Sequence, residues 1–441
     1  MARILPFAVT TSRSQRIMVY SHDTYGLGNI RRMLAICQYL LQSIPHLSIL
    51  LVSGSPLLHS FRLPQGLDYI KLPCLNRSSS GEMKAKYLNT NIESTLKLRS
   101  ELILTAAKNY QPDIVLVDKK PLGIRGELKP TIDYLKRDLG NTKFILLLRD
   151  ILDTPEKTIQ EWQRENYYSI TESIYDRILV VGMAKIFDLV KAYQFSALLA
   201  SKVRYCGYIR KELGSKNRWT LRHKLGINDH DKLVLVTPGG GEDGYELIHN
   251  YLIGVGQHPD DFHQRKIYSL IFCGAEMPLR QQQKIHQLAR KIPGVKVLEF
   301  THDLMSYISA ADAVISMCGY NTITEVLQAG KPAIVVPRVK PGKEQFIRAK
   351  RLAKAGLIKM IDPDVLNPDL LIAALLKSLE KSNHDNFTQY LDFAGLSRVS
   401  DYLSMLLFDC FSTKLLQGHF LLSSQFRKVE KVMSQPLAVN N

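Results

Sequence analysis

The segment after the first apolar run of the chain carries residue types suited to proton transfer. It has the sequence SHDTYGLGNIRR at 21–32. A histidine at the carboxyl end of a strand can act as a general base near neutral pH. His22 is therefore a candidate base, with Asp23 to orient it or to replace it. The only other histidines in the first half of the chain, His46 and His59, follow Pro- or Ser-containing turns and are placed less well. A second interpretation stays open, in which His22 and Asp23 cap the turn or pair with each other.

Glycines in the same segment shape the loop that holds this histidine. Gly26 and Gly28 permit a tight turn and a close approach of the backbone to a ligand. Asn29 follows, at the start of an expected helix whose free N–H groups and positive dipole end can attract an anion. No third glycine completes a dinucleotide-binding fingerprint. An ordinary strand-to-helix turn and a ligand loop are both compatible with the pattern.

Two further strand ends in the first half of the chain carry charged residues. An apolar run at 114–117 leads into Asp118, and another at 144–148 leads into Arg149 and Asp150. A charge just past a buried strand is often only solvated. Several charges at the shared carboxyl edge of a parallel sheet favour a binding surface. We therefore expect these side chains to line the same ligand-binding edge as the candidate base.

A glycine-rich loop opens the second half of the chain. The apolar run 233–236 is followed by TPGGGEDG at 237–244. The backbone amides of Gly239, Gly240 and Gly241 can converge on a phosphate or diphosphate, because no side chains stand in the way. No Gly-Lys-Ser/Thr follows, so the loop is not the ATP-binding P-loop. The alternative is a flexible turn, which would seldom need four glycines in six positions.

The strand end with the most candidate groups lies at 313–326, with the sequence AVISMCGYNTITEV. Gly319 closes the turn, and Asn321 or Thr322 is expected to cap the next helix, whose amides can hold further phosphate oxygens. Glu325, one turn into that helix, can accept hydrogen bonds from ribose hydroxyls. Thr322-x-x-Glu325 also matches a capping box, which would give Glu325 a purely structural task. The pattern leaves both interpretations open.

Strands that alternate with helices must position these loops. Short apolar runs alternate with amphipathic stretches twice along the chain, which predicts two parallel sheets covered on both faces. The basic, Gly-punctuated stretch 205–226 separates the two series. The predicted fold class is α/β, with two tandem Rossmann-like doubly wound domains at 1–210 and 211–382 facing a cleft. A C-terminal helical segment follows at 383–441. In such sheets ligands bind outside the carboxyl ends of the strands.

The composition fits a folded protein with an anionic partner. Of the 441 residues, 45% are hydrophobic and 22% are charged, which is typical of globular chains. The 58 Lys+Arg against 41 Asp+Glu give a net charge of +17. That charge favours nucleic acid, anionic lipid or a phosphorylated small molecule as partner. No motif typical of nucleic-acid binding accompanies it, so nucleic acid is not expected.

The distribution of apolar residues and cysteines indicates the cellular location. No apolar run approaches the ~20 residues that a membrane-spanning helix needs. The six cysteines are widely spaced and include no Cys-x-x-Cys pair. This spacing favours a reducing cytoplasm over a disulfide framework or a zinc site.

Taken together, these residues resemble a glycosyltransferase of the two-Rossmann-domain (GT-B) type. The family they resemble is family 28, which includes the bacterial peptidoglycan N-acetylglucosaminyltransferase and plant galactolipid synthases. The segment 21–32 resembles a group of predicted bacterial glycosyltransferases. The clearest part of the resemblance covers 299–362 and has, in the order of the family, Thr301-His302-Asp303, Ser316–Glu325, Ala329-Gly330-Lys331-Pro332, Pro337, Gln345 and Ala355-Gly356.

The resemblance implies roles for both domains. The second domain would bind a nucleotide-sugar, usually a UDP-sugar, and the first would hold the acceptor. The diphosphate would contact Gly239–Gly241 and Gly319–Thr322, and Glu325 would bind the ribose. Gln345 with Glu344 would reach sugar hydroxyls, and the backbone at 300–303 would meet the base. Neither metal nor cofactor is implied, because amides and a helix dipole can stabilise the leaving nucleoside diphosphate. Enzymes of family 28 invert the anomeric centre.

One position departs from the family pattern. The family has a histidine after the second glycine of the first loop, where this chain has Asn29, and asparagine cannot take a proton at neutral pH. We therefore expect His22, or Asp23 in its place, to deprotonate the acceptor hydroxyl during transfer of a hexose or N-acetylhexosamine.

Two alternatives to transfer stay open. One is a nucleotide-sugar epimerase or hydrolase of the same fold, and the other is a non-catalytic nucleotide-sugar-binding protein. The positive charge also exceeds what one nucleotide-sugar can neutralise. That excess predicts a peripheral contact with an anionic membrane surface, near a lipid-linked acceptor.

Overall fold

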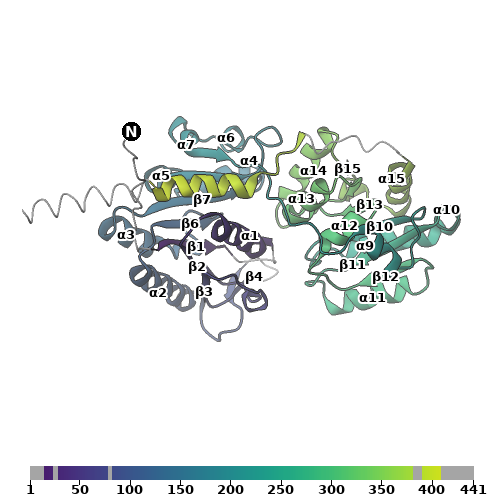
Figure 1. The fold of residues 1–441 in the computed structure, drawn as a ribbon, viewed down its shortest axis with the longest axis horizontal. Coiled ribbons are helices and arrows are strands. Elements are labelled where there is room, and N and C mark those ends of the chain that lie inside the picture. The colour runs from purple at the N-terminus through teal and green to yellow at the C-terminus, as the bar shows by residue number, and fades with distance from the viewer. Residues whose placement is uncertain (1–13, 23–27, 78–81, 381–389, 409–441) are drawn as a thin grey trace, which may run out of the picture.

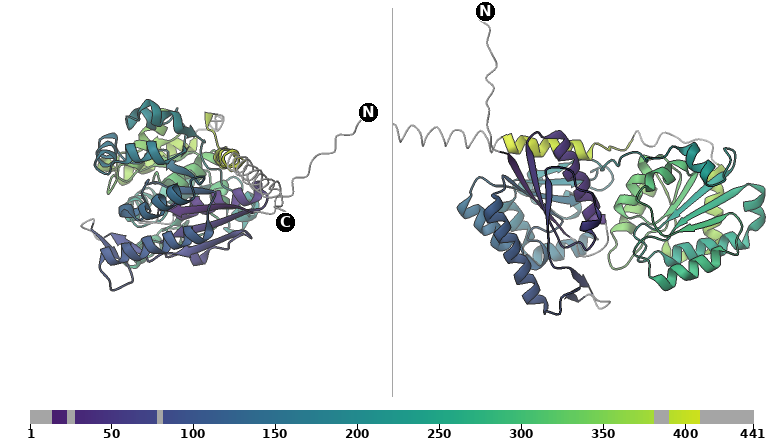
Figure 2. Two further views of the ribbon diagram at one scale, coloured as in Figure 1. Left: turned by 90° about the vertical axis from the view of Figure 1, so that its left-hand side faces the viewer. Right: turned by 60° about the horizontal axis from the view of Figure 1, so that its bottom comes forward.

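The computed structural model describes residues 14–22, 28–77, 82–380 and 390–408, and it contains two α/β units (Figure 1). The first unit has a seven-stranded sheet in the order β3-β2-β1-β6-β7-β8-β9, and the second has a six-stranded sheet in the order β12-β11-β10-β13-β14-β15. All the neighbouring strands in both sheets pair in parallel. Figure 2 shows helices on both faces of each sheet. This confirms the prediction of two tandem doubly wound domains.

The strands of the two sheets are β1 (Gln15–Ser21), β2 (Leu47–Ser53), β3 (Leu67–Lys71), β6 (Ile114–Asp118), β7 (Lys143–Arg149), β8 (Arg177–Val181), β9 (Val203–Tyr205), β10 (Lys232–Thr237), β11 (Ile267–Phe272), β12 (Val295–Leu298), β13 (Ala313–Ser316), β14 (Ala333–Val335) and β15 (Lys359–Met360). A separate antiparallel hairpin is formed by β4 (Leu75–Arg77) and β5 (Met83–Ala85).

The helices of the first unit are α1 (Gly28–Ser43), α2 (Ile92–Tyr110), α3 (Lys129–Asp138), α4 (Pro155–Arg164), α5 (Tyr167–Ile174), α6 (Leu189–Ala192) and α7 (Ala197–Lys202). Those that follow are α8 (Arg218–Lys224), α9 (Tyr245–Gln257), α10 (Pro259–Gln264), α11 (Leu279–Ala289), α12 (Leu304–Ala310), α13 (Tyr320–Gln328), α14 (Glu344–Lys354) and α15 (Pro368–Glu380). Short 3₁₀ turns lie at η1 (Leu58–Ser60), η2 (Ile124–Gly126) and η3 (Pro363–Val365).

Burial on both faces explains why the central strands are continuous apolar runs. In β7 the five residues between Lys143 and Arg149 are all buried, and all four residues of β13 are buried. Strands at the centre of a parallel sheet have helices on each side, so they show no alternation of polar and apolar residues. The apolar runs at 114–117, 144–148 and 233–236 correspond to β6, β7 and β10, whose ends lie within one residue of them.

The structure differs from the prediction at short and edge elements. The strands β3, β9 and β15 and the β4–β5 hairpin were not predicted, because these short strands are only partly buried and form no continuous apolar run. The helices α4 and α5 follow each other closely and are separated at Asn166, which has the left-handed conformation (φ 53°). No helix in the described ranges is long and apolar enough to cross a membrane.

The chain passes from the first unit to the second through 206–217 and later returns. Residues 395–408 form a helix that lies along the first unit (Figure 2). Gly395 N donates to Tyr208 O at 3.0 Å, and Arg398 Nη1 donates to Cys206 O at 3.0 Å. The described part of the predicted C-terminal segment thus packs on the first domain. The domain limits at 210 and 382 stay predictions.

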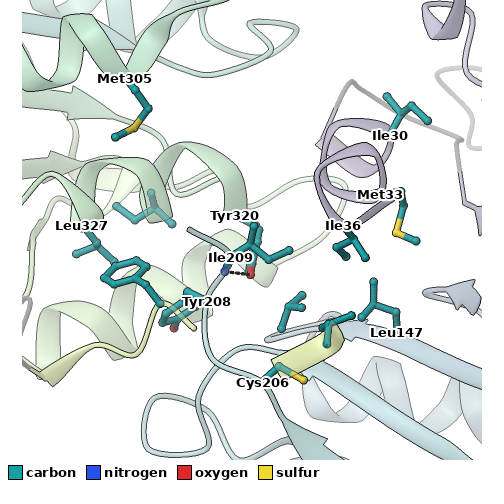
Figure 3. Packing of buried hydrophobic residues seen from close by; sticks show 14 of the residues in the cluster. Ile30, Met33, Ile36, Leu147, Cys206, Tyr208, Ile209, Met305, Tyr320 and Leu327 are labelled. Carbon is teal, nitrogen blue, oxygen red and sulfur yellow. Dashed lines mark hydrogen bonds between the residues drawn. The ribbon is translucent and has the colours of Figure 1, made fainter. Parts of the chain in front are cut away.

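Buried apolar side chains from both units pack against each other around the linking segment at Tyr208 and Ile209 (Figure 3). Buried side chains of α1, such as Ile36, belong to the same cluster as Tyr208 and Tyr320 of the later chain. The hydroxyl of Tyr320 accepts a hydrogen bond from Ile209 N at 3.5 Å. This packing brings α1 and α13 together, and with them two of the predicted ligand loops.

Candidate active site

The carboxyl ends of three adjacent strands form the rim of the first domain. Tyr20 in β1 pairs with Val117 in β6, and Asp118 in β6 pairs with Leu147 in β7. Continuing these registers places His22 beside Lys119, with Arg149 next along the same edge. The structure therefore brings the candidate base together with basic side chains, as parallel pairing predicts.

His22 is a buried, neutral imidazole. Only 3% of the residue is exposed, and its Nδ1 has no hydrogen-bond partner among the described residues. Burial lowers the pKa of His22 well below its usual value, and the nearby charges of Lys119, Lys120, Arg99 and Arg149 lower it further. The ring is therefore unprotonated near neutral pH and can accept a proton. Asp23 and Gly26 lie outside the described residues, so the alternative pairing of His22 with Asp23 is not tested.

Asn29 and Asp118 are engaged in the fold rather than free at the rim. Asn29 Nδ2 donates to His22 O at 2.5 Å, and Asn29 Oδ1 accepts from Arg32 at 3.2 Å. The same guanidinium forms a 2.7 Å ion pair with Asp118, and both side chains are at most 2% exposed. Asn29 thus fixes the backbone of the candidate base, and Asp118 neutralises Arg32. Asp118 lies at the predicted edge, with one oxygen paired to Arg32 and the other buried without a described partner.

Lys119 and Arg149 form a basic pair at the rim, and the sequence analysis predicted only Arg149 there. Lys119, which sequence reasoning did not single out, has a left-handed backbone (φ 72°), and its pKa is lowered to about 7 by burial and by the charges of Arg149 and Lys120. Arg149 has a buried Nε without a partner. Neither side chain forms a salt bridge with another described residue. Two basic groups beside His22 that form no salt bridge with a described residue make this edge suited to an anionic ligand. The Asp-Lys-Lys run after an apolar strand was the available signal.

Asp150 joins the two domains. Its carboxylate accepts bonds of 2.7 and 2.8 Å from Arg348 of α14, and both side chains are 1% exposed. Arg348 also donates to Cys318 O at 2.7 Å. The sequence-based expectation placed Asp150 on a ligand-binding edge, but its oxygens are committed to this interdomain pair.

Backbone geometry explains the glycines of the loop after β10. Gly239 and Gly241 have φ values of 93° and 96°, which side chains rarely tolerate. A Cβ atom on Gly241 would lie 2.3 Å from Cys273 O, and one on Gly240 would lie 2.6 Å from Glu276 Oε2. A Cβ atom on Gly239 would lie 3.1 Å from Thr322 Oγ1. The glycine loop therefore faces the first turn of α13, as expected if both bind one ligand.

The first turn of α13 is not closed by a side chain. The N-cap is Gly319, which has no side-chain cap, and Thr322 lies inside the helix. The expectation that Asn321 or Thr322 caps this helix is therefore wrong, and so is the capping-box interpretation of Glu325. Asn321 Nδ2 instead donates to Gly28 O at 3.0 Å, across the domain boundary. The amides at the start of α13 remain available for an anion, and the start of α1 lies opposite them.

The remaining predicted donor residues lie beside this turn. Burial raises the pKa of Glu325, and the charges of Lys211 and Arg31 partly offset that effect. Glu344 accepts a 2.8 Å bond from Arg338, and its pKa is about 2 because Arg338 and Arg149 outweigh the effect of burial. Gln345 Oε1 is buried without a described partner. Its Nε2 lies 3.9 Å from the Cβ position of Gly319. Gln345 therefore has a side-chain oxygen that can accept a hydrogen bond from a hydroxyl group.

Together these elements form one site between the domains. Uncapped helix amides and a glycine loop converge on one side, and a neutral histidine lies at the rim of the other. Within the part of the chain that the structure describes, no three His, Cys, Asp or Glu side chains are grouped as metal ligands. The arrangement can bind a diphosphate and take a proton from a group held on the first domain.

Comparison with known proteins agrees with this fold. A solved glycotransferase of kitacinnamycin has a TM-score of 0.61, with 14% identity, and the alignment covers 90% of this chain and all of that one. MurG from Acinetobacter baumannii has a TM-score of 0.56, with 15% identity, over 89% of this chain and all of that one. The two-domain fold is therefore GT-B.

Sequence relatives identify the second domain. Residues 249–394 match the glycosyltransferase family 28 C-terminal domain. A UDP-N-acetylglucosamine–N-acetylmuramyl-(pentapeptide) pyrophosphoryl-undecaprenol N-acetylglucosamine transferase from Caldicellulosiruptor saccharolyticus is 24% identical over 82% of this chain and 88% of its own length. The enzyme of the same description from Acetivibrio thermocellus is 30% identical over 41% of this chain and 49% of its own length. The chain is a glycosyltransferase with the GT-B fold, and its residues 249–394 resemble the C-terminal domain of family 28.

Proposed function

We propose that this enzyme transfers a hexose or N-acetylhexosamine from a nucleotide-sugar, with UDP as the nucleotide, to an acceptor hydroxyl. The observation that carries the proposal is the convergence of the Gly239–Gly241 loop with the uncapped start of α13. Backbone amides there can bind the donor diphosphate, so the reaction needs no metal ion. The match to the family 28 C-terminal domain spans 249–394 and includes the start of α13.

The proposed reaction is a single displacement. His22 accepts the proton of the acceptor hydroxyl, and the acceptor oxygen forms a bond to the anomeric carbon. The bond from that carbon to the phosphate oxygen breaks, and both its electrons leave with the nucleoside diphosphate. The departing charge is stabilised by the amides of the glycine loop and of α13. Attack from the face opposite the leaving group inverts the anomeric centre.

A thermal-shift panel tests the donor. UDP, GDP, dTDP and ADP, each alone and as a sugar conjugate, are added to the protein. We expect UDP and one UDP-sugar to raise the unfolding temperature by several degrees, because a ligand at 100 times its Kd adds about 2.7 kcal/mol of stability. If another nucleotide stabilises the protein instead, the nucleobase of the proposed donor is wrong. If none of the ligands shifts the unfolding temperature, the nucleotide-sugar proposal is refuted.

The products separate transfer from the two alternatives of the same fold. A transferase releases UDP faster when the acceptor is present and forms a new glycoside. An epimerase converts the UDP-sugar without an acceptor, and a hydrolase gives free sugar. A purely binding protein releases no UDP at all. The family assignment favours transfer.

We further propose that the acceptor is lipid-linked and that the enzyme works at a cytoplasmic membrane surface. The loop between β5 and α2 exposes Tyr87 and Leu88, which are 69% and 45% exposed, beside Lys86. Exposed apolar side chains next to basic ones are typical of peripheral membrane contacts. The net charge of +17 would favour an anionic surface.

Vesicle binding checks this location. We expect the protein to sediment with vesicles that contain anionic phosphatidylglycerol, and to be released as salt is raised, because the attraction is screened. Replacing Tyr87 and Leu88 together by serine should weaken sedimentation severalfold. Leu213→Ser removes an apolar side chain that is 84% exposed elsewhere and serves as the control. Equal loss in both variants, or binding to neutral vesicles alone, would contradict the proposal.

A further inference from the structure

Arg31 of the first domain reaches the donor half of the site. Its guanidinium carbon lies 5.2 Å from the centre of the Phe300 ring, which follows β12 in the second domain. Gly28, three residues earlier on α1, accepts the hydrogen bond from Asn321. Residues three apart lie on the same side of a helix. This side of α1 is therefore turned toward the loops of the second domain.

The surroundings of Arg31 place it between the two diphosphate-binding elements. Burial lowers the pKa of the guanidinium, and the carboxylates of Glu325 and Glu276 act in the opposite direction. Glu276, in the segment after β11, lies against the glycine loop, since its N donates to Gly240 O at 2.8 Å. Glu325 lies one turn into α13. Arg31 forms no salt bridge with any described residue, and its side chain is half-buried.

These acids pose an electrostatic problem for the proposed ligand. A donor diphosphate in this site would lie near Glu276 and Glu325, both of which would repel it. Backbone amides carry only partial positive charges. A full positive charge on the same side of the site would offset the repulsion. Lys86 acts on Glu276 and Lys211 on Glu325, whereas Arg31 acts on both acids.

We propose that Arg31 is a donor-binding residue supplied by the acceptor domain, and that its guanidinium binds the diphosphate of the nucleotide-sugar and of the leaving nucleotide. This inference rests on the proposed function. Arginine suits the task because its planar guanidinium pairs with phosphate oxygens through two parallel N–H groups and stays charged at every physiological pH. Because Arg31 belongs to the first domain, donor binding would also hold the two domains together.

Binding of uridine, UMP and UDP by isothermal titration calorimetry tests the role of Arg31. The proteins are wild type, Arg31→Gln, Arg31→Lys and the control Arg137→Gln, whose side chain is 75% exposed on α3 and pairs with Asp138. We expect Arg31→Gln to weaken UDP about 10- to 100-fold, UMP less and uridine hardly at all, since each charged hydrogen bond contributes about 1.5–3 kcal/mol. Arg31→Lys should retain part of the affinity for UDP, and the control should match wild type.

Each other outcome has a distinct meaning. An equal loss for all three ligands in Arg31→Gln would show that Arg31 packs on the base or ribose, and it would overturn the proposal. Unchanged UDP affinity would also overturn it while leaving the proposed function intact. Wild-type protein that binds no nucleoside diphosphate of the thermal-shift panel would refute both. If Arg31→Gln does not fold, the comparison of Arg31→Lys with wild type decides by the same trend from uridine to UDP.

Discussion

Replacement of His22 by glutamine should lower kcat by ~10²–10⁴-fold, because general-base catalysis contributes about that much. Glutamine is polar and uncharged like the buried neutral imidazole, but it cannot take a proton. The affinity for the nucleotide should not change, because His22 is not among the groups proposed to bind the donor. The measurement is the rate of UDP release in the presence of acceptor. His59→Gln, at an exposed position of η1, removes a histidine from the same domain and should have full activity.

The pH dependence gives a second sign of the same base. Burial lowers the pKa of His22 well below 6.5, so the imidazole stays unprotonated as pH falls through 6.5. The rate should therefore stay level from pH 8 to below 6.5 and fall only at more acidic pH, whereas a histidine of ordinary pKa would lose half its activity at 6.5. Full activity in His22→Gln would remove the assignment, and loss of activity in Asp23→Asn alone would move it to Asp23.

Removing one partner of the buried Asp150–Arg348 pair should destabilise the protein by about 3–5 kcal/mol. Asp150→Asn leaves the guanidinium of Arg348, which is 1% exposed, without a counter-ion. Adding Arg348→Gln to that variant should recover part of the loss, because the uncompensated charge is then gone. The free energy of unfolding is measured in urea by circular dichroism.

An exposed pair provides the matched control for this prediction. Glu380→Gln breaks a 2.8 Å contact with Arg265 in which both side chains are more than 40% exposed, and such pairs contribute about 0–1 kcal/mol. If Asp150→Asn costs no more than Glu380→Gln, the interdomain pair does not stabilise the fold. If the double variant is less stable than Asp150→Asn alone, the buried charge is not the cause of the loss.

Local signals explain what the sequence could predict. The buried central strands are continuous apolar runs, so β7 and β13 were recognised without difficulty. The loop at Gly239–Gly241 was also predicted. Its positive φ values and close contacts require glycine, so the glycines themselves indicate the loop. Features set by neighbours along the chain are readable in this way.

The sequence could not predict contacts between residues that are far apart along the chain. Asp118 and Asp150 appeared as free charges at strand ends, but their partners lie 86 and 198 residues away and become neighbours only in the folded chain. The Thr322-x-x-Glu325 match failed for a local reason: α13 begins at Tyr320, so both residues lie inside the helix. A capping pattern specifies residue types, whereas the position of the first helical residue depends on the preceding strand and turn.

The two passages of the chain between the domains limit how the domains can move. Tyr208 N donates to Asp392 O at 2.7 Å, and Ile209 forms an antiparallel bridge with Ala394. One linker would act as a swivel and allow rotation in any direction. Two linkers that are hydrogen-bonded to each other act as a hinge with one axis, because twisting would break the bonds between them. Opening and closing about that axis would return Gly28 to the same position relative to Asn321 after each cycle. The two halves of the site would therefore come back to the same relative orientation.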